Sequence, residues 1–282
     1  MPKPDLPGTA VVVANTVEEL VEQMATDLLH HSLNCLRAFG DFHLAVSGGA
    51  TPEPLYRQLM IDPAYRGVPW TRSHLWVVDE RRVPFTDERS NWNGIQGLLG
   101  DHAGIPLPQQ HPIPAMEDDV EDRYEHEIQS ALQWRERGQD RLDYILLGLG
   151  EDGHTASLFP HSPALRERER LVRVSRAPER TEVPERVTMT LPIINAARFI
   201  AIMVTGGRKQ AIVERIAREH RARRTASKAG AGGASIFSSQ IEALPVLNVH
   251  PVGGVVYWYL DRAACPPVAP SARPQRDGNP PT

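Results

Sequence analysis

The stretch YILLGLGEDGHTASLFP, residues 144–160, carries the features that decide the fold. Its first four residues, Tyr144–Leu147, are an apolar run that predicts a buried strand. Gly148, Gly150 and Gly153 follow with the spacing G-x-G-x-x-G, which is also the spacing of a dinucleotide-binding fingerprint. The first question is therefore whether these glycines hold a nucleotide or serve another ligand.

A dinucleotide site would need two further features. Gly153 should begin a full helix, and an acidic residue should follow about 20 residues later. Instead, Pro160 and Pro163 interrupt the chain soon after Gly153, and the next predicted strand ends at Arg176 without an acid. Arg176 leaves an NADP phosphate open as an alternative, and a purely structural tight turn is another. We favour a different ligand, because a fingerprint without its helix is weak evidence.

Predicted strands and helices alternate along the rest of the chain. Apolar runs predict strands at residues 9–14, 43–47, 75–79, 142–147, 171–175, 187–191, 199–204 and 255–260. Helical spacing and capping residues predict helices over 16–39 and 117–137, and others that begin near 51, 90 and 209. This alternation predicts an α/β fold with a largely parallel sheet and flanking helices.

We predict a single α/β domain over residues 1–262. The proline-rich residues 263–282 are predicted to form a disordered tail. Residues 221–236, which are basic and then rich in Gly, Ala and Ser, are predicted to form a mobile loop.

Composition narrows the possible functions. The chain has 282 residues, a net charge of −4 and a pI near 6.3, which does not favour a nucleic-acid partner. No apolar stretch approaches the roughly 18 residues of a membrane span, and the start MPKPDLPGTA lacks the apolar core of a secretory signal. Cys35 and Cys265 have neither metal nor disulfide spacing. We expect a cytoplasmic protein, a monomer, with no metal, membrane or nucleic-acid partner.

Unusual polar residues follow four of the predicted strands. They are Ser47-Gly48-Gly49, Asp79-Glu80-Arg81-Arg82, Gly148–His154 and Thr205–Lys209. Ligands of open α/β sheets bind outside the carboxyl ends of the strands, so we expect these four segments to meet at one site.

Asp152 and His154 are the residues of the glycine motif that can do chemistry. Residues i and i+2 of an extended chain point the same way, so their side chains are predicted to lie together. A histidine titrates near neutral pH, which suits a general base. Asp152 would either orient His154 or bind the substrate. A single histidine after a turn is more often a cap or a surface residue, and only its neighbours favour the catalytic interpretation.

Two glycine-rich turns favour an anionic ligand. Gly48 and Gly49 lead to Thr51, which is predicted to cap a helix whose first residue is Pro52. Free backbone N–H groups at such a helix start bind anions, although a merely well-capped turn would look the same. The segment 205–209 repeats the pattern and adds Lys209, and Arg186 precedes another strand. Cations beside glycine-rich helix starts suit a phosphate monoester.

Taken together, these motifs resemble the glucosamine-6-phosphate isomerase/6-phosphogluconolactonase family. The stretches that carry the resemblance are VSGGATP (46–52), VVDERRVP (77–84), SNWNG (90–94), LGLGEDGHTASLFP (147–160), PERVTMTLPIINAA (184–197) and VTGGRKQAI (204–212). The resemblance implies a modified doubly wound sheet, like that of the glucosamine-6-phosphate deaminase, ribose-phosphate isomerase and CoA-transferase group. It implies no nucleotide or other cofactor.

The resemblance also implies an activity and its residues. The activity is hydrolysis of 6-phospho-D-glucono-1,5-lactone, a small sugar-phosphate lactone, to 6-phosphogluconate in the oxidative pentose phosphate pathway. His154 would be the base, Asp79 and Arg81 would flank the reacting centre, and Asp152 would help to bind substrate. The candidates for the phosphate are Gly48, Gly49, Thr51, Arg186 and Lys209.

Two alternatives stay open. A run with another acid commonly follows the Asp-Gly-His of the deaminases, whereas Thr155–Pro160 stands here and Arg81 follows the Asp-Glu pair, which favours the lactonase. A sugar-phosphate-binding regulator is the second alternative, but a pure binder has no need of a general base. One departure from the family is Ala50, which stands where Ser or Thr is usual and removes a hydroxyl.

Overall fold

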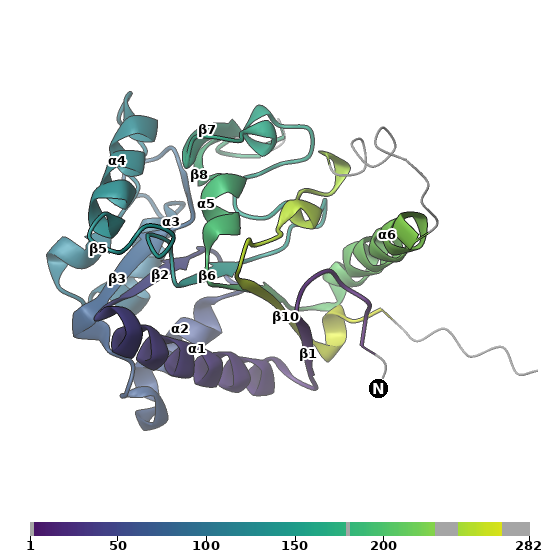
Figure 1. Ribbon diagram of the computed structural model, residues 1–282, viewed down its shortest axis with the longest axis horizontal. Coiled ribbons are helices and arrows are strands. Elements are labelled where there is room, and N and C mark those ends of the chain that lie inside the picture. The colour runs from purple at the N-terminus through teal and green to yellow at the C-terminus, as the bar shows by residue number, and fades with distance from the viewer. Residues whose placement is uncertain (1–2, 179–180, 229–241, 267–282) are drawn as a thin grey trace, which may run out of the picture.

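The computed structural model describes residues 3–178, 181–228 and 242–266 of the chain (Figure 1). The strands are β1 (Ala10–Ala14), β2 (Phe42–Val46), β3 (Ser73–Val77), β4 (Asp79–Arg81), β5 (Gln110–His111), β6 (Tyr144–Leu147), β7 (Val172–Arg176), β8 (Glu185–Met189), β9 (Phe199–Val204) and β10 (Val255–Asp261). The α-helices are α1 (Val17–Phe39), α2 (Glu53–Ile61), α3 (Asn91–Ile95), α4 (Val120–Leu132), α5 (Leu191–Ala196) and α6 (Gln210–Lys228). Short helical turns are η1 (Pro63–Tyr65), η2 (Trp70–Arg72), η3 (Gln96–Gly100), η4 (Leu107–Gln109), η5 (Pro163–Arg166), η6 (Gly207–Lys209), η7 (Pro245–Asn248) and η8 (Arg262–Ala264).

Seven strands form the main sheet in the order β1-β10-β9-β6-β2-β3-β5, and every neighbouring pair is parallel. Central strands of such a sheet are covered on both faces, and every residue of β2, β6 and β9 is buried. All of these residues are apolar except His43 of β2. Helices α1 and α2 lie on one face, and α5 and the second sheet lie on the other (Figure 1). The predicted largely parallel α/β fold is confirmed.

The chain reverses its direction of travel across the sheet between β2 and β6. After β2 it proceeds outward through β3 to β5, whereas after β6 it proceeds to β9 and β10 on the other side. The connections that leave the carboxyl ends of β2 and β6 run toward opposite sides of the sheet, and this leaves a crevice between the two loops. The loops that follow β2 and β6 are the two glycine-rich segments of the sequence.

A second sheet, with the order β4-β8-β7, is antiparallel and lies over the first. The predicted strand 75–79 was wrong in one respect, because the chain leaves the main sheet at Val78. The N–H of Val78 donates to Val46 O of the main sheet, and its carbonyl accepts from the N–H of Met189 in the second sheet. Asp79 therefore begins β4, and the strands predicted at 171–175 and 187–191 pair with each other outside the parallel sheet.

Helix ends follow local chemistry, with three corrections. The Thr16 hydroxyl caps α1 by accepting from the N–H of Glu19, and Ser90 caps α3 in the same way. Thr51 does not cap α2, which begins at Glu53 without a side-chain cap. The predicted helix 117–137 is shorter, over Val120–Leu132.

The third correction concerns α6. It continues to Lys228 through residues predicted as a loop, because Ala and Arg favour helix and basic side chains suit the negative end of the helix dipole. Residues 229–236 of that prediction lie outside the described residues.

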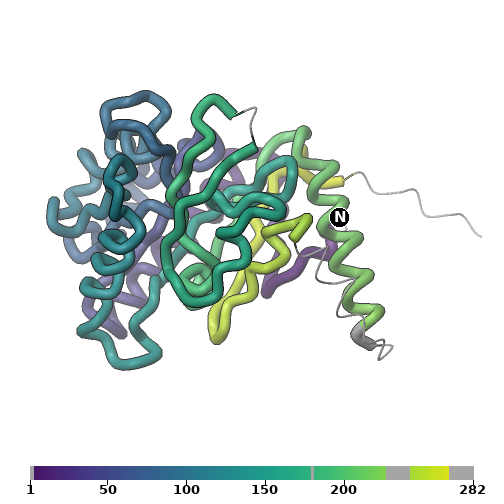
Figure 2. The backbone as a smooth tube through the Cα atoms, turned by 90° about the horizontal axis from the view of Figure 1, so that it is seen from above, coloured from purple at the N-terminus to yellow at the C-terminus, as the bar shows by residue number. Residues whose placement is uncertain are grey.

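The two ends of the described chain pack on the domain. Asp5 forms an ion pair with Arg224 of α6, and Figure 2 shows the N-terminal segment beside that helix. Ala264 is buried in η8, two residues beyond the predicted domain boundary. Residues 267–282 of the predicted tail lie outside the described part.

A stack of three histidines, of which His43 and His111 are buried and His74 is partly buried, lies at the amino edge of the sheet, away from the glycine loops. His43 stacks on His74 with 4.3 Å between the ring centroids, and His74 Nδ1 lies 2.9 Å from His111 Nε2. Burial lowers the pKa of His43, although the nearby Asp41 opposes the effect. Burial and the neighbouring imidazoles lower the pKa of His74 to about 3. The fold therefore favours the neutral form of His43 and of His74.

This predicts a loss of stability in acid. The unfolded chain binds a proton on His74 near pH 6.5, whereas the folded protein resists it down to about pH 3. The stabilisation that comes from keeping His74 neutral is fully present above about pH 6.5. As the pH falls below this value, we expect the free energy of unfolding to decrease, by at most about 1.4 kcal/mol per pH unit for each such histidine. Urea unfolding of the wild type and of His74→Gln over this window measures the effect. Equal pH slopes for the two proteins would contradict it.

Candidate active site

A cavity of about 580 Å³ opens at the carboxyl ends of β2 and β6, and we call it the switch-point cavity. It collects residues from the loop after β2, from β4, from the loop after β6, from β8 and from η6 after β9. All nine predicted site residues line it: Gly48, Gly49, Thr51, Asp79, Arg81, Asp152, His154, Arg186 and Lys209. The structure thus brings the four predicted polar segments to one place, while the role of each residue stays a prediction.

The glycine motif folds into a tight loop around one side-chain pair. The Gly150 N–H donates to His154 O at 2.8 Å, and the Gly153 N–H donates to Gly150 O at 3.1 Å. Gly153 has a φ of +89°, a conformation that L side chains rarely adopt. A Cβ on Gly150 would lie 2.1 Å from His154 Nδ1. Gly153 opens no helix, and the next helical turn is η5, so the loop lacks the helix start that would bind a pyrophosphate. These glycines instead leave room for the side chain of His154.

Asp152 orients His154. Its Oδ1 lies 2.6 Å from His154 Nδ1 and also accepts from the His154 backbone N–H at 3.0 Å. Burial alone would raise the pKa of Asp152, but hydrogen bonding to His154 outweighs it and lowers that pKa. An ionised Asp152 fixes the proton on Nδ1 and leaves the lone pair on Nε2. Nε2 bonds to none of the described residues, and the ring, which packs on Phe159, is one-third exposed.

Gly150→Ala tests this packing. The new methyl group would overlap His154 Nδ1 and lie 2.6 Å from Asp152 Oδ1, so we expect the pair to separate. A loss of about 10- to 100-fold in kcat is expected, since misplacing a catalytic group by about 1 Å can cost that much. Gly97→Ala is the matched control, because an added Cβ there meets nothing within 4 Å. Equal kcat values of the two variants would contradict the prediction.

Three cations line the cavity. Arg81 of β4 and Arg186 of β8 are directly opposite each other in the antiparallel ladder. Burial lowers the pKa of Arg186, and the charge of Arg81 lowers it further. Burial also lowers the pKa of Lys209. Within the described chain none of the three forms an ion pair, although Arg81 donates to Arg89 O and Arg186 to Val183 O and Glu185 O. Because no ion pair engages them, these cations can bind an anionic ligand.

Backbone groups after β2 add to this positive field. Gly49 has a φ of +91°, and the N–H groups of Gly49, Ala50 and Thr51 donate to none of the described residues. They precede α2, where the helix dipole also favours an anion. A Cβ on Gly48 would lie 2.1 Å from Asn91 Oδ1, so this glycine is needed for the close approach of the loop to α3.

Sequence reasoning gave no role to Glu80, Asn91 or Ser157. Glu80 is fully buried and accepts from the N–H groups of Arg81, Asn91 and Trp92 and from the Ser90 hydroxyl, at 2.7–2.9 Å. Burial raises its pKa despite these bonds. Asn91 donates to Asp79 O at 2.6 Å. The alternation of side chains along a strand could have indicated the different position of Glu80, because it turns Glu80 away from the cavity that Asp79 and Arg81 face.

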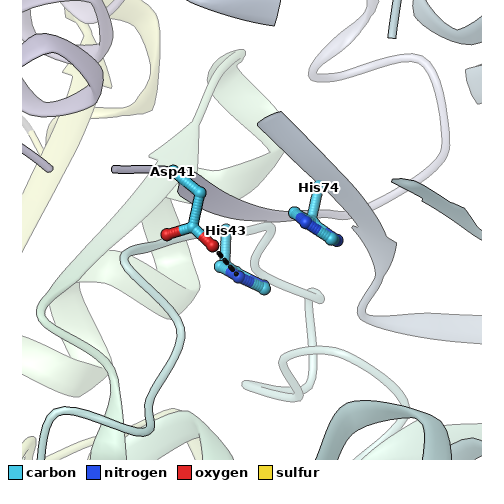
Figure 3. Close-up of side chains that lie close together, drawn as sticks. All are labelled: Asp41, His43 and His74. Atoms are coloured by element: carbon cyan, nitrogen blue, oxygen red, sulfur yellow. Dashed lines mark hydrogen bonds and ion pairs between the residues drawn. The ribbon is translucent and has the colours of Figure 1, made fainter. Parts of the chain in front are cut away.

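Asp41, His43 and His74 could at first sight hold a metal ion (Figure 3). Trp76 Nε1, which can only donate, bonds to His43 Nδ1 at 3.1 Å. The proton of neutral His43 is therefore on Nε2, which donates to Asp41 Oδ2, while Arg135 donates to Asp41 Oδ1. With these bonds made, His43 has no lone pair for a metal, and we interpret the cluster as structural.

A parallel α/β sheet with an oriented histidine and unpaired cations at its switch point defines an enzyme site for a small anionic ligand. The model of the family "Glucosamine-6-phosphate isomerases/6-phosphogluconolactonase" matches residues 15–237, and the chain belongs to this family. Among the described residues no helix is long and apolar enough to cross a membrane.

Individual relatives agree with this assignment. The human GDH/6PGL endoplasmic bifunctional protein is 35% identical over 252 residues, which is 86% of this chain but 28% of that protein. The chain thus spans less than a third of that relative. A 6-phosphogluconolactonase of Haemophilus influenzae is 31% identical over 88% of this chain and 95% of its own length. The structure of a 6-phosphogluconolactonase from Trypanosoma cruzi is 25% identical, with a TM-score of 0.70, over 90% of this chain and 95% of that one.

Proposed function

We propose that the protein is a 6-phosphogluconolactonase that hydrolyses 6-phospho-D-glucono-1,5-lactone to 6-phosphogluconate. The observation that carries the proposal is the His154–Asp152 pair, whose free Nε2 faces a cavity with three unpaired cations. The names of the relatives of matching length support the same activity.

The mechanism uses His154 twice. Nε2 of the neutral ring takes a proton from water while the water oxygen attacks C1 of the lactone. Asp152 stabilises the imidazolium that forms, and Arg81 or an N–H of a glycine loop stabilises the tetrahedral oxyanion. The bond between C1 and the ring oxygen then breaks, and the imidazolium returns its proton to that oxygen. The reaction needs no cofactor.

The phosphate supplies orientation. Arg186, Lys209 and the backbone N–H groups between Gly48 and Thr51 would hold it, and Asp79 would lie near the reacting centre. The lactone is a reactive ester, so accurate placement of one base and one water accounts for much of the acceleration required. A monomeric state and a cytoplasmic location stay predictions.

A coupled assay tests the proposal. Glucose 6-phosphate and its dehydrogenase generate the lactone, and 6-phosphogluconate dehydrogenase reports its hydrolysis, with and without the protein. Because the lactone opens spontaneously, the rate in excess of that background is the measured quantity. A clear excess supports the lactonase. If a folded protein gives no excess, ammonia release from glucosamine 6-phosphate would identify the deaminase alternative, and binding of 6-phosphogluconate without turnover would identify a regulator.

A further inference from the structure

We propose that Ser157 is a positioning residue that holds the carboxylate of Asp79 for the reaction. The Ser157 hydroxyl donates to Asp79 Oδ2 at 2.6 Å, and its side chain lines the switch-point cavity. Ser157 is 1% exposed and Asp79 is 9% exposed, so water competes little for this bond. The inference rests on the proposed function, because it concerns the placement of a residue beside the reacting centre.

Ser157 is itself held on both sides by the second sheet. Its N–H donates to Thr188 Oγ1 at 3.2 Å, and its carbonyl accepts from the Ser175 hydroxyl at 2.7 Å. Thr188 is the register partner of Asp79 in the ladder between β4 and β8. The donor and acceptor of the Ser157–Asp79 bond are therefore fixed to the same rigid sheet, which limits the movement of the carboxylate.

The backbone before Ser157 is arranged to aim this hydroxyl. Ala156 has a φ of +49°, which is unusual for a residue with a Cβ, and the Leu158 N–H donates to Thr155 O at 3.0 Å across the turn. Such a conformation is unfavourable and persists only where the surroundings enforce it. The turn begins one residue after His154, so it links the position of the base to that of Asp79.

The single bond matters because, among the described residues, no other side chain donates a hydrogen bond to Asp79. Within the described residues its carboxylate forms no ion pair, and the Ser157 hydroxyl is the one side chain that donates to it. With Oδ2 occupied by Ser157, Oδ1 is left for the substrate. Without the hydroxyl the carboxylate could rotate, and the geometry at the reacting carbon would suffer more than phosphate binding.

A double-mutant cycle tests the proposal. We expect Ser157→Ala to lower kcat about 10-fold, the size of effect for a lost hydrogen bond to a charged group, with KM changed less than about 3-fold. In an Asp79→Asn background the same substitution is expected to cost less than about 2-fold, because the two residues act as one unit. Independent, multiplicative losses would overturn the proposal, as would full kcat in Ser157→Ala.

Controls separate positioning from stability and from the proposed function. Ser73→Ala also removes a buried hydroxyl, one that bonds to Pro69 O outside the cavity, and it should leave kcat unchanged. Ser157→Thr keeps the hydroxyl and should retain most of the activity. If Ser157→Ala does not fold, Ser157→Cys supplies a weaker donor of similar size for the same cycle. A wild-type protein without lactonase activity would refute the proposed function. An active wild type in which the two substitutions lower kcat independently would refute only this inference.

Discussion

Replacing His154 with alanine is expected to lower kcat for lactone hydrolysis by about 10²- to 10⁴-fold, the usual contribution of a positioned general acid–base group. His154 is the one histidine that lines the cavity among the described residues, and its Nε2 is free because Asp152 bonds to Nδ1. KM should change little, since the phosphate would bind elsewhere. The coupled assay measures both constants.

His126→Ala is the matched control for this variant. His126 is exposed on α4, where it bonds to Ser130, and lies outside the switch-point cavity. We expect it to retain wild-type activity. A His154→Ala protein that kept its full kcat while remaining folded would refute the assigned base and with it the mechanism.

Replacing Arg186 with methionine is expected to raise KM by about 30-fold or more, with a smaller effect on kcat. Methionine keeps much of the length of the side chain but removes the charge, and losing one partner of a buried charge contact costs roughly 2–5 kcal/mol. Arg186 is 8% exposed and forms no ion pair within the described residues, so it can form one with an incoming phosphate. Arg186→Lys should restore only part of the affinity, because lysine keeps the charge but an ammonium cannot bind bidentately.

Arg176→Met controls for the loss of one positive charge from the second sheet. Arg176 is an exposed residue of β7 and is absent from the lining of the cavity. We expect its KM to equal that of the wild type. If both variants behaved alike, or if Arg186→Met left KM unchanged, the phosphate would have to be held by Lys209 and the glycine loop without Arg186.

Local patterns in the sequence were sufficient for the elements that depend on their own residues. The strand Phe199–Val204 was predicted with its observed bounds, and α1 has the predicted cap, Thr16, and the predicted last residue, Phe39. An apolar run and a capped amphipathic pattern are local signals. The pairing of His154 with Asp152 was also predicted, but from the alternation of side chains in an extended chain. The structure instead brings the two side chains together in a tight loop, in which Gly153 has a φ of +89°.

Local sequence patterns were misleading where contacts between distant segments determine the structure. Val78 looks like the interior of one apolar strand, yet its N–H and C=O bond to two different sheets. Glu80 looks like a second acid of the site, yet it is buried under α3 by four donors from residues 81–92. Thr51 looks like a helix cap, but α2 begins after Pro52 and leaves this residue on the cavity.

Local patterns were enough to predict the kind of fold, the residues that can do chemistry and the segments that carry them, because periodicity, glycine spacing and residue type act within a few positions of the chain. The tertiary structure alone decided how those residues are related. It placed Arg81 opposite Arg186 and set Ser157 against Asp79, 78 positions apart in the chain. Those contacts arise from strand order and from the packing of one sheet on another, and no local pattern contains that information.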